Sequence, residues 1–203
     1  QRHDWDEAAA HLVAAVQSNP ASEEAQFALA AVMEAQGDRA SACYQRGFIN
    51  LQTDRPSLAL PPFRRMIALA PQRVDGPLMA CLAYIKMERL DLAAAEAQRG
   101  LAAHPNDPKL LARLGLLYTI NHNRPLARQL CEAWLRRDPN ATEAAVLLGR
   151  LAREDQRLPD AQRYGEQALA LDSQNASACL ELSKTLAALP GPDNARRALD
   201  LAQ

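Results

Sequence analysis

Histidine is the residue type in this 203-residue chain that most readily binds metal or moves protons. The four histidines are His3, His11, His104 and His122, and no two stand four residues apart, as a pair of metal ligands on one helix face would. The chain also lacks the HExxH, GxSxG, P-loop and GxGxxG motifs. The sequence therefore predicts a chain that is not an enzyme and that uses no metal or other cofactor.

Cysteine is the other residue type that could carry chemistry. The four cysteines are far apart and form no CxxC pair: Cys43, Cys81, Cys131 and Cys179. We expect free thiols that pack in the core as small apolar residues. Such thiols fit a reducing compartment.

Composition and charge narrow the function classes further. The formal net charge is −1, which argues against a nucleic-acid partner. No run of 18 apolar residues occurs, so no direct membrane insertion is predicted. Apolar residues make up 48% and charged residues 23%, as in an ordinary soluble protein of the cytoplasm or periplasm. These values leave the compartment and the oligomeric state open.

A repeated helical pattern organises the chain and must position whatever site it has. In residues 108–139, apolar and small residues fall at helical spacing on two helices joined by a short turn. Three prolines close successive segments of this kind, each 34 residues from the next: Pro71, Pro105 and Pro139. A fixed period of this length predicts a stack of repeats.

Residues 108–139 resemble a tetratricopeptide repeat. The residues that match the family's large, small and closing-proline positions are Leu111, Leu114, Gly115, Tyr118, Ala127, Cys131 and Pro139. Trp134 departs from the pattern, because alanine is usual at its position. The resemblance implies an all-α fold, an α-solenoid of antiparallel helix pairs.

The regular part of this frame begins at Val74. The repeats predicted from there are 74–107, 108–141, 142–175 and a partial repeat at 176–203. A solenoid normally covers its last apolar face with a polar capping helix, and no such helix follows here. We therefore expect the chain to be a fragment of a longer protein.

The frame fails before residue 74. Pro20 takes the place of a closing proline, so the segment 1–53 is predicted to start in mid-repeat. The 51 residues from Pro20 to Pro71 amount to one and a half repeats and hold three helices. We expect these helices at about 23–36, 39–53 and 61–70.

The pairing of these three helices is left open by the sequence. Ala40 and Tyr44 suit a second-helix role for the middle helix, whereas Gly47 suits a first-helix role. Pro61 and Pro62 cannot lie in a helix interior, so the last helix is expected to start at one of them. One helix is left without a partner, and residues 54–73 are predicted to be an irregular unpaired helix or a hinge.

The resemblance also implies where a partner would bind, because first helices of such repeats line a concave groove. The predicted apolar part of the groove is Leu78, Met79, Leu82 and Ile85, joined by Leu116, Val146 and Leu147. The predicted charged part is basic, with Lys109, Arg113, Arg150, Arg153 and Lys184, and has Glu143, Glu154 and Glu181 among these residues. Two plainer interpretations stay open: the basic residues form a solvated helix face, or Met79 and Leu82 are covered by adjacent repeats.

The chemistry of these residues predicts a protein or peptide partner. Arg150 and Arg153 are three apart and share a helix face, so together they suit an acidic group. The apolar part suits an amphipathic helix. The family's carboxylate clamp is matched only by Lys109 and Arg113, so chaperone-tail binding is not predicted. We expect the double change Arg150→Glu and Arg153→Glu to weaken an acidic partner and leave folding intact.

Two functional readings follow. The first is a protein-interaction scaffold that binds a peptide or helix in the groove of the superhelix. The second is a repeat arm of a larger enzyme or export machine, which positions a catalytic or membrane part.

Overall fold

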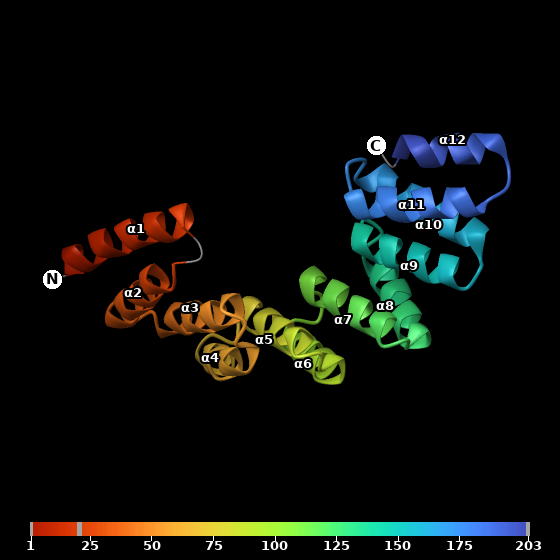
Figure 1. Ribbon diagram of the computed structural model, residues 1–203. Coiled ribbons are helices and arrows are strands. Elements are labelled where there is room, and N and C mark those ends of the chain that lie inside the picture. The colour runs from red at the N-terminus through yellow and green to blue at the C-terminus, as the bar shows by residue number, and fades with distance from the viewer. Residues whose placement is uncertain (1, 20–21, 202–203) are drawn as a thin grey trace. The chain divides into compact units, whose positions relative to one another are not determined.

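The computed structural model describes residues 2–19 and 22–201, and the secondary structure of this part is entirely helical (Figure 1). The helices in chain order are α1 (Arg2–Ser18), α2 (Glu23–Ala35), α3 (Arg39–Gln52), α4 (Pro56–Leu69), α5 (Asp75–Lys86), α6 (Leu90–Ala103), α7 (Pro108–Ile120), α8 (Arg124–Arg137), α9 (Thr142–Glu154), α10 (Leu158–Leu171), α11 (Ala176–Ala188) and α12 (Pro192–Leu201). A 34-residue repeat holds two helices and two turns, and most of these helices have the length that this division requires.

The chain folds into two compact units, Gln1–Leu110 and Leu111–Gln203, divided near the start of α7. In the first unit each helix from α1 to α6 packs on the next, and α3 also contacts α5. In the second unit α8 to α12 pack in the same way, and α9 also contacts α11. Contacts between successive and between alternate helices are those of stacked helix pairs, so the predicted α-solenoid fold is confirmed within each unit.

The same strained turn closes the first helix of four successive pairs. The residues in the left-handed conformation are Asp54, Glu88, His122 and Gln156, each 34 residues from the next, with φ between 55° and 60°. At each turn the following N–H donates to a carbonyl five residues back, as from Arg157 to Ala152. This is the Schellman bond pattern, which usually places glycine in the left-handed position. The recurrence carries the repeat frame back to α3 and α4.

We expect Gln156→Gly to stabilise the second unit by about 0.5–1 kcal/mol. The left-handed conformation costs a non-glycine residue roughly 1–2 kcal/mol, and glycine's extra freedom in the unfolded chain offsets part of that gain. Urea denaturation measures the change. Gln167→Gly, inside α10, is the matched control and should destabilise by about 1 kcal/mol. Equal effects of the two substitutions would contradict the strained turn.

The helix that the sequence left without a partner packs against two neighbouring helices. The helix expected at 61–70 is α4, which starts at Pro56 and packs against both α3 and α5. A Cβ atom on Gly47 of α3 would lie 2.5 Å from the ring of Phe63 of α4, so the two helices meet closely at this glycine. Gly47 thus marks α3 as the first helix of a pair with α4, one of the two pairings the sequence left open. The hinge predicted for 54–73 stays a prediction.

Pro61 and Pro62 lie inside α4 rather than at its start. Pro62 has no N–H, so the carbonyl of Leu58, four residues earlier, loses its helical donor. The side-chain amide of Asn50 in α3 lies 3.5 Å from that carbonyl and donates to it. The same amide donates to the Arg46 carbonyl at 2.8 Å. A donor from the partner helix thus reduces the cost of the interior prolines.

Candidate partner-binding groove

A pocket of about 350 Å³ opens in the second unit between α7, α9 and the start of α11. These three helices are the first helices of successive pairs, the ones that the repeat frame places along the groove. Its lining residues are Ala112, Leu116, Glu143, Val146, Leu147, Arg150, Asn175 and Ser177. The lining is mostly apolar, and its two charged residues are Glu143 and Arg150.

The structure brings five of the predicted groove residues to this pocket: Leu116, Glu143, Val146, Leu147 and Arg150. Val146 and Leu147 of α9 are buried, so they form the base of the pocket rather than an exposed surface. An apolar floor with an arginine at its edge can hold a large apolar side chain and pair with a nearby carboxylate.

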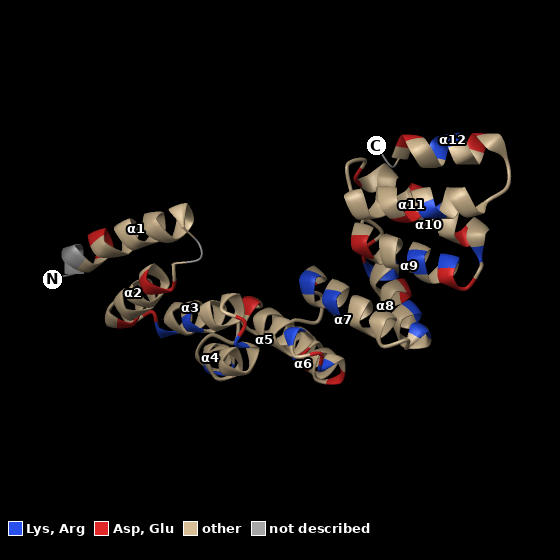
Figure 2. Cartoon of the chain, viewed as in Figure 1, with Lys and Arg blue, Asp and Glu red and all other residues tan. Residues whose placement is uncertain are grey.

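Three of the predicted basic residues, Arg150, Arg153 and Lys184, converge on one acidic side chain, Glu181 of α11. Arg150 Nε donates to Glu181 Oε1 at 3.2 Å, and Arg153 Nη2 donates to Oε2 at 3.0 Å. Lys184 Nζ lies 3.5 Å from Oε1. The Glu181 side chain is only 5% exposed, whereas Arg150, Arg153 and Lys184 are 29%, 26% and 47% exposed. Acidic and basic segments accordingly occur together on α9 and α11 (Figure 2).

The pKa of Glu181 is lowered from its ordinary value. Burial is the largest influence and opposes ionisation, but the hydrogen bond from Arg153 and the charges of Arg150, Arg153 and Lys184 together outweigh it. Glu181 is therefore ionised at neutral pH and balances part of the positive charge that the sequence suggested for the groove. Arg153 Nε is buried and makes no hydrogen bond within the described residues.

This cluster corrects one expectation. The double change Arg150→Glu and Arg153→Glu was expected to leave folding intact. Both arginines hold the buried Glu181, so the double change would place three carboxylates together with Lys184 as the remaining cation beside Glu181. Removing the partners of a buried charge is strongly destabilising, and the substitution is therefore unsuitable for testing binding.

The remaining predicted basic residues stand apart from this cluster. Arg113 of α7 is half-buried and makes no ion pair within residues 2–19 and 22–201. It lies three residues from Leu116 and therefore shares the helix face that reaches the pocket. Lys109 is exposed on the first turn of α7 and belongs to the first unit.

The predicted apolar part of the groove lies in the first unit. Leu78 is buried, with 8% of its surface exposed. Met79 and Leu82 are half-buried and pack against a cluster that includes Leu51 of α3 and Phe63 of α4. This placement favours coverage by the adjacent repeat over a free apolar surface.

Sequence reasoning placed Glu143 in the groove but missed two other polar residues that line the pocket, Asn175 and Ser177. Asn175 gave a usable signal, because it precedes α11 and its side chain caps the helix by accepting from the Ala178 N–H at 3.0 Å. The convergence of three cations on Glu181 could not be predicted, because the frame alone does not fix side-chain directions between helices.

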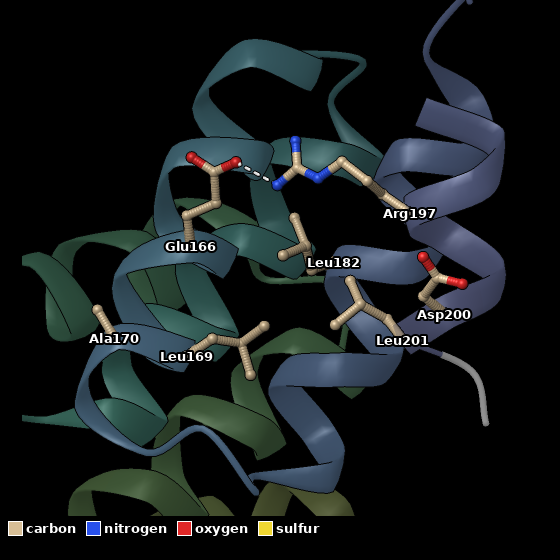
Figure 3. Close-up of a pocket in the computed structure, with 7 residues that line it drawn as sticks. All are labelled: Glu166, Leu169, Ala170, Leu182, Arg197, Asp200 and Leu201. Carbon is tan, nitrogen blue, oxygen red and sulfur yellow. Dashed lines mark hydrogen bonds and ion pairs between the residues drawn. The ribbon is translucent and has the colours of Figure 1, made fainter. Parts of the chain in front are cut away.

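A second pocket, of about 460 Å³, lies between α10, α11 and α12 (Figure 3). Leu169, Leu182 and Leu201 project toward it, and an ion pair between Glu166 and Arg197 at 3.0 Å spans one side. Because α10 and α12 are second helices of their pairs, this pocket lies away from the predicted groove.

His104 and Cys131 have surroundings that fit a structural role. His104 Nε2 lies 2.9 Å from the Pro71 carbonyl, at the junction of two repeats. Burial raises the pKa of the Cys131 thiol to about 12. In the described part of the chain, no cluster of three potential metal ligands is present. None of the helices described has the length and apolar character needed to cross a membrane.

The fold agrees with the family comparison. The family model named tetratricopeptide repeat matches residues 78–142. These residues are therefore tetratricopeptide repeats, and the helices described on either side continue the same α-solenoid fold. No curated protein matches the sequence.

Solved structures share the fold at low sequence identity. The type IV pilus biogenesis factor PilW has a TM-score of 0.71 and 16% identity, with 97% of this chain and 90% of PilW covered. PilF of Pseudomonas aeruginosa has a TM-score of 0.68 and 21% identity, with 81% and 75% covered. MamA of Desulfovibrio magneticus RS-1 has a TM-score of 0.61 and 18% identity, with 81% and 92% covered. At these identities the similarity concerns the fold.

Proposed function

We propose that this chain is a protein-interaction scaffold whose second unit binds a peptide or helix of a partner along α7, α9 and α11. The observation that carries the proposal is the pocket of about 350 Å³ between these helices, with Leu116 on its wall and Arg150 at its edge. The partner segment presents a large apolar side chain to the pocket and a carboxylate to Arg150.

The contacts of Arg150 support a carboxylate rather than a bulk electrostatic attraction. Its Nε–H is used by Glu181, while the residue also borders the pocket. A guanidinium has five N–H donors in a fixed fork. The N–H groups on its outer edge can therefore still donate two parallel hydrogen bonds to a carboxylate. The proposal therefore assigns the specificity to one arginine and one apolar pocket.

Arg150→Gln tests the proposal. Peptides selected from a displayed random library on the wild-type protein should combine an acidic residue with a neighbouring large apolar residue. We expect Arg150→Gln to weaken the selected peptides about tenfold, because a charge-assisted hydrogen bond contributes roughly 1.5–3 kcal/mol. Fluorescence anisotropy with a labelled selected peptide measures the loss.

Lys184→Gln is the matched control. It removes a cation that also pairs with Glu181 but does not line the pocket. We expect its effect on affinity to stay below about threefold, as for an exposed ion pair. Equal losses in the two variants, or selected peptides without acidic residues, would contradict the proposed binding mode.

A further inference from the structure

Glu181 is a buried carboxylate surrounded by three cationic side chains. Two arginines and one lysine surround it with donors at 3.0–3.5 Å. Two arginines that converge on one carboxylate form an arrangement typical of sites for acidic ligands. Here the carboxylate is supplied by the chain itself, from α11.

Arg150 belongs to both this cluster and the pocket. Its Nε–H faces Glu181, and the same side chain borders the pocket that Glu181 does not line. One guanidinium charge is therefore shared between an internal carboxylate and whatever acidic group enters the groove. A second carboxylate near Arg150 is also repelled by the first, since like charges at short range oppose each other's ionised forms.

We infer that Glu181 is an internal competitor that sets how strongly the groove binds acidic partners. It acts through Arg150 and does not touch the partner, so it is a specificity-determining positioning residue. The inference deepens the proposed function and rests on it for the identity of the competing ligand. Without the Glu181 charge, the three cations form an anion site that is filled in the native chain.

Glu181→Gln tests the inference, with Glu132→Gln as its matched control. Both substitutions remove one negative charge from the second unit, but Glu132 of α8 pairs with Arg136 on the surface and does not line the groove pocket. We expect Glu181→Gln to bind the selected acidic peptide about tenfold more tightly and Glu132→Gln to bind it with nearly wild-type affinity. Weaker binding, or equal gains in the two variants, would overturn the inference.

A second measurement uses no partner peptide and so separates this inference from the proposed function. Sodium sulfate is added to the wild type and to both variants, with sodium chloride at equal ionic strength as reference. We expect a sulfate-dependent rise in Tm for Glu181→Gln beyond that of the other two proteins, because an anion then binds the emptied site. An equal sulfate response in all three proteins would show that no such anion site exists.

A measurement on the wild type covers the case in which Glu181→Gln does not fold. The Arg150 side-chain Nε–H resonance, assigned by its loss in Arg150→Lys, reports the hydrogen bond to Glu181. We expect the selected acidic peptide to shift this resonance, because the peptide carboxylate draws the guanidinium away from Glu181. A resonance that stays unmoved at saturating peptide would refute the competition.

Discussion

Phe63→Ala should lower the free energy of unfolding of the first unit by about 3–5 kcal/mol, the usual range for a buried phenylalanine. Phe63 of α4 is fully buried. It packs in a cluster with Leu51 of α3 and with Ala80 and Ala83 of α5, so its removal leaves a cavity where three helices meet. Urea denaturation followed by circular dichroism measures the loss.

Phe27→Ala is the control for this substitution. Phe27 of α2 belongs to the same unit but is 49% exposed, so its loss should cost less than about 1 kcal/mol. If Phe63→Ala were as mild as Phe27→Ala, the packing of α4 between α3 and α5 would be wrong. The pair of substitutions therefore tests whether α4 packs against both α3 and α5.

Gly115→Leu should destabilise the second unit by about 1–3 kcal/mol, because it overpacks a close contact between helices. A Cβ atom at this position would lie 2.9 Å from Leu147 Cδ1 and 3.3 Å from Cys131 Sγ. Leu147 also lines the pocket, so the larger side chain would displace the pocket floor as well. Thermal unfolding and peptide affinity should both change.

Gly149→Ala separates the effect of packing from the effect of helix propensity. A Cβ atom at Gly149 of α9 meets its nearest neighbours at 3.5 Å, which is ordinary van der Waals contact. Alanine should therefore stabilise α9 by up to about 1 kcal/mol, the propensity difference between the two residues. Destabilisation by Gly149→Ala comparable to that of Gly115→Leu would contradict the packing described.

The helices from residue 74 onward could be predicted from sequence because period, small residues and closing prolines agree there. Before residue 74, Pro20 resembled a closing proline and shifted the frame by half a repeat. The Pro61-Pro62 pair then suggested a helix start, since an interior proline lacks a donor. The Asn50 amide that serves the Leu58 carbonyl comes from another helix, and no local rule reveals it.

Part of the candidate site could likewise be predicted from sequence, and part could not. Repeat positions predicted Leu116 and Arg150 at the groove, and both line the pocket. They could not show that Arg150 and Arg153 are already paired, because this depends on Glu181 of α11, which lies 31 and 28 residues further along the chain. Position within a repeat predicts which face a residue occupies, but not the side chain that it meets on the next repeat.

The thiol of Cys131 offers a built-in reporter of motion. It is fully buried beneath Gly115, and its raised pKa keeps it protonated at neutral pH. A thiol reagent attacks the thiolate, so it can modify Cys131 only when α7 and α8 separate. The rate of modification would therefore measure how often this helix pair opens, and a bound peptide that spans α7 and α9 would slow it.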